Sequence, residues 1–253
     1  MIKPILDRLP AVKKSGDLIH WGQLIGAGLP LLISEQAQQQ PGVYLLVVPD
    51  TPTALRLEQE LRVFAAPSLS ILSFPDWETL PYDVFSPHQD IISQRLRTLY
   101  QLPKQQTAMV IVPISTLLLR VCSPAYLNQH SLLVQTGQQL DLVQLKQQLT
   151  AVGYRAVDQV MEHGEFSARG SLLDLYPMGS SLPYRIDFFD DEIDGIRLFD
   201  PESQRTLEKV EQIELLPAHE FPTDQAAIER FRSQYRQQFT ARTEPESLYQ
   251  QVS

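Results

Sequence analysis

The stretch that decides the fold is residues 165–206, EFSARGSLLDLYPMGSSLPYRIDFFDDEIDGIRLFDPESQRT. Short runs in which apolar and polar residues alternate are separated by Gly, Pro and Asp, which is the pattern of antiparallel strands joined by tight turns. Alternate residues of 184–189 point to opposite faces of a strand. The two sets are Tyr184, Ile186 and Phe188 on one face, and Arg185, Asp187 and Phe189 on the other.

Phe189 is the residue whose placement matters most for function. If the first set faces the core, Phe189 is left outside on the same face as Arg185. An exposed aromatic beside an arginine is the pairing that protein interfaces favour as anchors. The alternative is that a second layer of structure buries Phe189, and the pattern alone leaves both interpretations open.

Residues 17–127 alternate between helix and buried-strand patterns, which is typical of a layered α/β unit with a parallel sheet. We expect a helix that begins at the cap Thr51 and carries Pro52 in its first turn. The other expected elements are strands at 43–48, 68–74 and 108–112 and helices at 91–102 and 115–120. This order is the one that a RecA-like nucleotide-binding half-domain shows.

Residues 131–216 have a different character, with short strands and many turns. A strand at 132–135 is followed by a Gln-rich helix at 141–152, which ends at Gly153, a residue suited to a left-handed cap. The remaining strands predict an α+β unit, with a hairpin turn at 190–192 whose loop length the sequence does not fix. A helix at 223–239, capped by Thr223, follows.

The predicted fold class is therefore α/β, in three segments. Residues 1–127 form a degenerate RecA-like parallel-sheet domain, and residues 128–217 form an inserted, antiparallel α+β domain. Residues 218–253 return to pack near the first domain, and we expect that the chain continues in a longer protein.

The composition limits the functions that the chain can have. It has 253 residues, 43% hydrophobic and 20% charged, with a formal net charge of −9. Phosphate contacts need clustered Lys and Arg, so this balance argues against a chain that grips nucleic acid unaided. Local basic patches remain an alternative, around Arg95 and Arg97 in a helix or around Arg155, Arg169 and Arg185 in the strand-rich region. Each of these arginines lies near acidic residues, which favours a mixed-charge solvated surface.

The location of the protein follows from what the sequence lacks. No apolar run suits a targeting segment or a membrane span. The single cysteine, Cys122, excludes an internal disulfide and a cysteine-based zinc cluster. We therefore expect a cytoplasmic location and no membrane partner.

Three longer segments carry a family resemblance. They are FPDWETLPYDVFSPHQDIISQRLRTLYQL (74–102), GYRAVDQVMEHGEFSARGSLLDLYPMGS (153–180) and LLPAHEFPTD (215–224). Together they resemble the N-terminal, UvrB-homologous module of the bacterial transcription-repair coupling factors, the Mfd family. The likeness runs from about Pro41 onward, and residues 165–206 also resemble the second domain of the nucleotide-excision-repair protein UvrB.

The resemblance implies a partner and a site. The partner is the repair protein UvrA, and the UvrA-binding residues map onto Arg169, Arg185 and Phe189. In the full-length family, an RNA-polymerase-binding domain and an ATP-dependent motor that moves on double-stranded DNA follow this module. The resemblance also implies that a distant C-terminal domain of the full-length protein covers the UvrA-binding face until the motor engages a stalled polymerase.

The nucleotide loop is degenerate. A phosphate-binding loop needs glycines, a Lys for the terminal phosphates and a Ser or Thr for magnesium. Where the fold places it, the chain reads GQLIGAGLPLLISE (22–35), so Gly26 and Gly28 remain while Leu29 and Pro30 replace the Lys and the hydroxyl residue. UvrB has an intact loop here, whereas the coupling factors resemble this chain. Nucleotide hydrolysis by these residues is not expected.

Other candidate sites are weaker. The acidic cluster at 187–194 lacks the spacing of a calcium loop and is better explained as a turn. His163 and Glu165 match half of a zinc-deaminase motif, but its cysteine pair is missing. A possible acid/base group lies in a Pro-rich loop and consists of Asp76, Glu78, Asp83 and His88. No activated nucleophile accompanies it, and we interpret the neighbouring Trp77, Leu80, Tyr82 and Phe85 as packing residues. We predict no catalytic residue, metal or cofactor, and the DNA-prying aromatic hairpin of UvrB has no counterpart between Leu72 and Gln94.

Two hypotheses result. The first is a non-catalytic module that recruits UvrA in transcription-coupled nucleotide excision repair. The alternative is an active, UvrB-like or helicase-like DNA-binding ATPase fragment. The missing lysine and the acidic charge favour the first.

Overall fold

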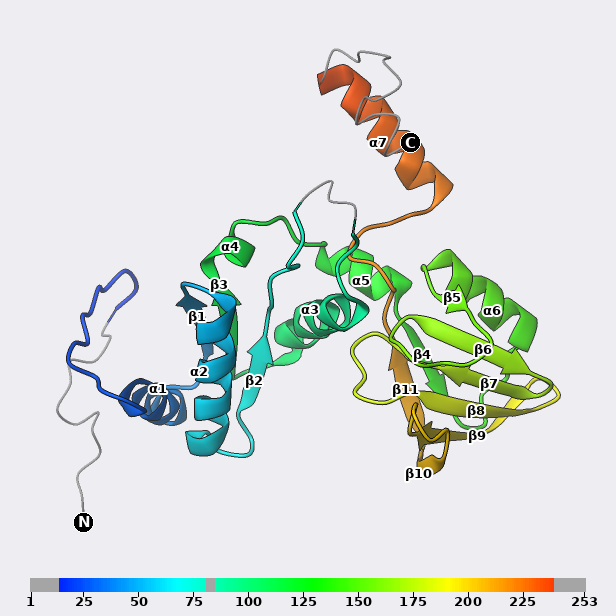
Figure 1. Cartoon of the computed structure of the whole chain (residues 1–253), viewed down its shortest axis with the longest axis horizontal. Coiled ribbons are helices and arrows are strands. Elements are labelled where there is room, and N and C mark those ends of the chain that lie inside the picture. Colours follow the sequence, from blue (N-terminus) through cyan, green and yellow to red (C-terminus); the bar gives the residue numbers. More distant parts are fainter. Residues whose placement is uncertain (1–13, 81–84, 239–253) are drawn as a thin grey trace. The chain divides into compact units, whose positions relative to one another are not determined.

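A computed structural model describes residues 14–80 and 85–238 of the chain (Figure 1). The chain divides into two compact units, Met1–Arg120 and Val121–Ser253. Each unit has its own sheets and its own buried side chains.

The first unit is built around a parallel sheet of three strands in the order β1-β3-β2. The strands are β1 (Val43–Val48), β2 (Ser70–Ser73) and β3 (Ala108–Pro113). The helices are α1 (Gly28–Gln39), α2 (Thr51–Phe64), α3 (Gln89–Gln101) and α4 (Ile114–Leu117), with a 3-10 turn, η2, at Leu102–Lys104. Figure 1 shows this unit in blue to green.

Helices cover both faces of this sheet. Ile33 of α1 and Leu61 of α2 pack with Met109 and Ile111 of β3 on one face. On the other face Val110 of β3 packs with side chains from β2, α3 and the 3-10 turn, among them Leu72, Leu99 and Leu102. Both faces of the central strand β3 are therefore buried, as a parallel sheet requires.

Strand β1 is only partly buried, although its continuous apolar run predicts a fully buried strand. Val43, Leu45 and Val47 are 54%, 54% and 44% exposed. They lie beside Ala108 and Val110 in the register, on the face where α3 covers the two other strands. Because β1 is an edge strand, only its alternate residues reach the core.

The start of α2 is also one residue earlier than the predicted cap. The carboxylate of Asp50 accepts a hydrogen bond of 2.8 Å from the backbone N–H of Thr53, so Asp50 is the cap. Thr51 and Pro52 are the first helical residues. An aspartate at this position satisfies a free N–H group and complements the helix dipole.

The second unit contains an antiparallel-rich sheet of six strands in the order β10-β9-β8-β7-β6-β5 and a two-stranded sheet β11-β4. The first set comprises β5 (Arg155–Ala156), β6 (Glu165–Arg169), β7 (Leu172–Leu175), β8 (Tyr184–Phe189), β9 (Glu192–Phe199) and β10 (Thr206–Val210). The remaining elements are α5 (Pro124–His130), β4 (Leu132–Gln135), α6 (Leu142–Ala151), β11 (Gln212–Leu215) and α7 (Gln225–Gln238).

One row of side chains anchors the six-stranded sheet. Leu173, Ile186 and Ile196 are direct neighbours across β7, β8 and β9, and each is at most 1% exposed. Successive strands from β6 to β10 pair antiparallel, whereas β5 and β6 pair parallel. Residues between these core positions necessarily lie on the opposite face of the sheet.

Helix α7 follows the sheets. Its cap is Asp224, whose carboxylate accepts a 2.9 Å hydrogen bond from the N–H of Ala227, rather than the predicted Thr223. No described residue of α7 is buried. The predicted final residue of this helix, Phe239, lies outside the described residues.

The predicted fold class is confirmed, because a parallel α/β unit precedes a unit dominated by antiparallel strands. The predicted insertion at 128–217, and the return of 218–253 to the first domain, stay predictions.

The end of α6 provides a test of the fold of the second unit. Gly153 has φ +97°, and a Cβ atom there would lie 2.5 Å from Cδ2 of His219 and 3.3 Å from Cβ of Ala218. The N–H of Ala218 donates to the carbonyl of Val152, which holds this segment against the helix end. Gly153→Ala should therefore lose about 1–2 kcal/mol from its backbone conformation and about 1–3 kcal/mol from overpacking.

Gly137→Ala is the matched control. Gly137 also has positive φ, +78°, but a Cβ atom there would have no neighbour within 4 Å. Urea unfolding of both variants should show a larger loss of unfolding free energy for Gly153→Ala. Equal losses would show that the contact with His219 does not constrain this helix end.

Candidate protein-docking face

Phe189 lies at the end of β8 and is 74% exposed. Strand alternation places Phe189 opposite the buried Phe188. An irregularity in β9 then keeps the hairpin in step, because Asp187 pairs with Gly195 but Phe188 pairs with Ile193 and Phe189 with Glu192. Phe188 and Ile193 stay buried, so Phe189 points to the opposite face. The hairpin loop is the two residues Asp190 and Asp191, and Asp190 adopts a left-handed φ of +51°.

The tip of this hairpin is fixed by a neighbouring segment, residues 137–140. The N–H of Leu140 donates to the carbonyl of Asp191 over 2.7 Å, and the N–H of Ile193 donates to the carbonyl of Gln138 over 3.0 Å. The side-chain amide of Gln139 donates to the carboxylate of Glu192 over 3.0 Å. Phe189 is thus an exposed aromatic ring on a braced support, which lowers the entropic cost of binding through it.

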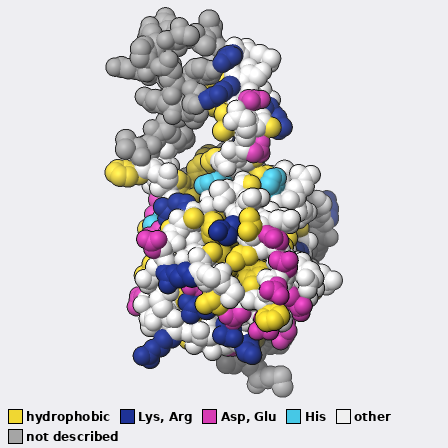
Figure 2. Space-filling model, turned by 90° about the vertical axis from the view of Figure 1, so that its right-hand side faces the viewer, with side chains coloured by type: hydrophobic (Ala, Val, Ile, Leu, Met, Phe, Trp, Pro, Cys, Tyr) yellow, Lys and Arg dark blue, Asp and Glu magenta, His cyan; other side chains and the backbone are white. Residues whose placement is uncertain are grey.

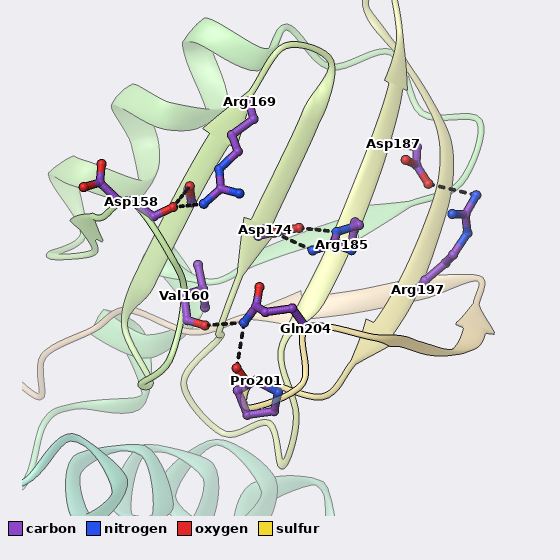
Figure 3. Close-up of polar contacts among 10 residues, drawn as sticks. Asp158, Val160, Arg169, Asp174, Arg185, Asp187, Arg197, Pro201 and Gln204 are labelled. Carbon is purple, nitrogen blue, oxygen red and sulfur yellow. Dashed lines mark hydrogen bonds and ion pairs between the residues drawn. The ribbon is translucent and has the colours of Figure 1, made fainter.

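Arg185 lies four residues earlier on β8, on the same face, but its side chain is already hydrogen-bonded within the domain. Its Nε and Nη2 atoms donate to the two carboxylate oxygens of Asp174 on β7 over 2.7 and 2.8 Å (Figure 3). Its Cζ atom lies 4.9 Å from the ring centroid of the buried Phe199. The hydrogen bonds to Asp174 raise the pKa of Arg185, so its charge is permanent.

Two arginines of this face are paired with carboxylates. Arg185 lies directly opposite Arg197 of β9, an arrangement that would be repulsive alone. Each arginine has its own carboxylate: Asp174 for Arg185, and Asp187 for Arg197, whose Nη2 lies 3.0 Å from Oδ2 of Asp187. That second contact lacks hydrogen-bond geometry, and Oδ2 of Asp187 has no hydrogen-bond partner among the described residues.

Arg169 completes the predicted set from β6. In the register Arg169 pairs with Leu172, and Leu172 pairs with Asp187, so Arg169 lies two strands away from Asp187 and in its row. Its Nη2 donates to the backbone carbonyl of Asp158 (Figure 3). Leu172, which lies between them, is 36% exposed. All three predicted residues therefore belong to one sheet face, with Leu172 as an additional apolar contributor.

A small apolar cluster, which sequence reasoning missed, borders this face. Phe199, Val160 and Tyr176 are buried together, with Val157 against them. The side-chain amide of Gln204 donates to the carbonyls of Val160 and Pro201, and so ties two loops across the cluster (Figure 3). The positive φ of Gln204, +60°, lies at this turn. Contacts between loops of this kind have no local sequence signature.

Glu165 holds the loop that carries Val160. Its carboxylate accepts hydrogen bonds of 2.9 Å from the N–H groups of Met161 and Glu162 and forms an ion pair of 2.9 Å with Arg155. It is 7% exposed. Glu165 is thus a structural carboxylate, and the ring of His163 contacts the carbonyl of Ser180 rather than joining a metal site. No group of three or more His, Cys, Asp and Glu residues suited to a metal occurs in the described part of the chain.

In the first unit, the segment in the position of a nucleotide-binding loop has the glycine turn but not the phosphate-binding side chains. Gly26 has φ +59°, and α1 begins at Gly28, with Leu29 40% exposed and Pro30 buried. No strand precedes this loop within residues 14–27. The helix start has no side-chain cap and no cationic residue within α1.

The Pro-rich loop of this unit is a structural element. Ser115 and Thr116 donate to Oδ2 of Asp76 over 2.6 and 3.1 Å, which lowers the pKa of Asp76. Arg95 is fully buried, against the rings of Phe74 and Trp77, so it contributes to no basic surface patch.

The predicted packing role of Leu80 and Phe85 is wrong. Each of the two side chains is 77% exposed, so neither belongs to the core of the first unit. Tyr82 and Asp83 lie outside the described residues. A Pro-rich sequence limits the backbone, but it does not bring these side chains into contact with the sheet.

The surface carries charges of both signs. Figure 2 shows hydrophobic side chains in the middle of one face of the molecule, with Lys and Arg and Asp and Glu around them. Within the described residues, no helix is long and apolar enough to cross a membrane.

Comparison with known proteins identifies this part of the chain. Residues 132–221 match the model of the UvrB interaction domain. The matched residues are similar to this family of domains. They include every residue of the predicted docking face.

The chain as a whole is similar to transcription-repair-coupling factors. It is 56% identical to the protein of Escherichia coli (strain K12) over 240 residues, which is 95% of this chain and 21% of the relative. It is 51% identical to the Haemophilus influenzae protein over 91% of this chain and 20% of the relative. It is 34% identical to the Bacillus subtilis protein over 60% of this chain and 13% of the relative. The chain thus spans about a fifth of the length of these first two relatives, and the family resemblance seen in the sequence is confirmed.

Proposed function

We propose that the open face of the UvrB interaction domain recruits UvrA for transcription-coupled nucleotide excision repair, and that this chain takes no catalytic part itself. The observation that carries the proposal is Phe189, an aromatic side chain that is 74% exposed on a hairpin braced by residues 137–140. Large exposed apolar side chains held rigidly beside arginines are the usual anchors of protein interfaces.

The arrangement of charges supports a protein partner rather than nucleic acid. Arg185 and Arg197 are each paired with a carboxylate, and only Arg169 bonds to a backbone carbonyl instead, so the face has little net positive charge. A face that binds phosphates needs uncompensated cations. This observation disfavours the alternative, a DNA-binding ATPase fragment.

The whole protein's role follows from the relatives' name and from the resemblance. Within it, we infer an ATP-dependent motor on double-stranded DNA and a contact with RNA polymerase outside this chain. Coverage of the docking face by a C-terminal domain of the same protein stays a prediction, and a cytoplasmic location suits this role. The exposure of Phe189 gives such coverage a physical motive, because an open apolar anchor binds non-specifically.

Phe189→Ala tests the docking face. Because the Phe189 side chain is mostly exposed, the unfolding midpoint should stay near that of the wild type, while the affinity for purified UvrA should fall by about 2 kcal/mol or more, roughly 30-fold. Val143→Ala is the control, because Val143 on α6 is 60% exposed and lies outside the sheet. Titration by calorimetry gives both affinities.

Two outcomes would count against the proposal. Unchanged affinity in Phe189→Ala would show that the anchor lies elsewhere, and an equal loss in Val143→Ala would show a non-specific apolar effect. Arg185→Ala is a less clear test than the sequence suggests, because it also breaks the half-buried ion pair with Asp174 and so costs stability.

Mg-ATP tests the absence of catalysis. Because Leu29 and Pro30 replace the phosphate-binding Lys and hydroxyl, hydrolysis should not exceed background and the melting temperature should not change. Bound nucleotide at a hundredfold excess over its dissociation constant would stabilise the chain by about 2.7 kcal/mol. A saturable shift of the melting temperature would therefore restore the ATPase alternative.

A further inference from the structure

The ion pair between Asp174 and Arg185 leaves one edge of the guanidinium unused. An arginine has five N–H groups, and Asp174 accepts one from Nε and one from Nη2. Within residues 14–80 and 85–238 no hydrogen-bond acceptor contacts Nη1. The Nη1–Nη2 edge, which can form two parallel hydrogen bonds, is therefore unoccupied.

The direction of this edge is fixed. Asp174 is 10% exposed at its side chain, and Arg185 is 21% exposed. The guanidinium also lies against Phe199, which is buried together with Val160 and Tyr176. A rotation of the guanidinium would break both hydrogen bonds to Asp174 and its contact with the ring.

The neighbouring carboxylates do not occupy the Nη1–Nη2 edge of Arg185. Asp174 and Asp187 are the nearby carboxylates, and Arg197 is directly opposite. Asp187 contacts Arg197, so it does not occupy the free edge of Arg185. These two guanidinium groups and two carboxylates together are neutral before a partner binds.

We propose that Asp174 is a positioning residue for docking: it holds the Nη1–Nη2 edge of Arg185 ready for a carboxylate of the protein partner. This inference rests on the proposed function. A carboxylate is the ligand that matches two parallel N–H groups, and a guanidinium already ordered by Asp174 loses less side-chain entropy when it binds. Asp174 itself need not contact the partner.

A double-mutant cycle with purified UvrA tests this role. Asp174→Asn keeps the shape but removes the charge and one acceptor, so it should weaken binding about 10-fold when Arg185 is present. In the Arg185→Ala background the same change should alter the dissociation constant by less than about twofold. Glu208→Gln, on the exposed strand β10, is the control and should leave binding unchanged. Equal losses in both backgrounds would overturn the proposal, because Asp174 would then act independently of Arg185.

Arg185→Lys keeps the positive charge and can still pair with Asp174, but an ammonium group has no fork. It should lose affinity about 5- to 10-fold. Wild-type affinity in this variant would show that the Nη1–Nη2 edge is not used, and would also overturn the proposal.

A measurement on the free protein separates this inference from the docking function. The ¹⁵N relaxation of the Arg185 Nε–Hε group should report an ordered side chain in the wild type and a mobile one in Asp174→Asn. An unchanged order parameter would overturn the positioning role whatever the partner. If the wild-type chain failed to bind UvrA, the proposed function would fall and the partner part of this inference with it, while the ordering of Arg185 by Asp174 would still be decided.

Discussion

The register of three strands controls the open face of the six-stranded sheet. Leu173, Ile186 and Ile196 align across β7, β8 and β9 and are buried on the core side. Because successive residues of a strand point to opposite faces, this alignment also aligns Asp174, Arg185 and Arg197 on the other side. A shift of one residue would exchange the two rows and bury the charges, so the packing energy of the core determines the chemistry of the open face.

The pairing register of β8 and β9 changes once, at the end of β8. The irregularity after Asp187 gives β9 one additional residue, which lets the short hairpin close while Phe188 and Ile193 stay in the core. Phe189 then remains on the open face and is supported by residues 137–140. The proposed docking face thus combines a braced aromatic end with two arginine–carboxylate pairs.

The sequence predicts the local part of this arrangement well. The parity of 184–189 places Phe189 opposite Ile186 and Phe188, because strand periodicity depends only on neighbouring residues. The partner of Arg185 could not be predicted, since Asp174 lies eleven residues away and meets it only through the register of β7 and β8. The burial of Arg95 against two aromatic rings and the exposure of Val43 and Leu45 could not be predicted either. Both depend on which elements pack together in the tertiary structure, and no local sequence pattern specifies that.

The central claim is that the open face of the sheet, and not the first unit, contacts UvrA. Hydroxyl-radical footprinting measures it directly, because the chain contains two phenylalanines of nearly equal exposure: Phe189 at 74% and Phe85, in the first unit, at 77%. We predict that saturating UvrA slows the oxidation of Phe189 and leaves that of Phe85 unchanged. Protection of Phe85 with undiminished oxidation of Phe189 would contradict the claim.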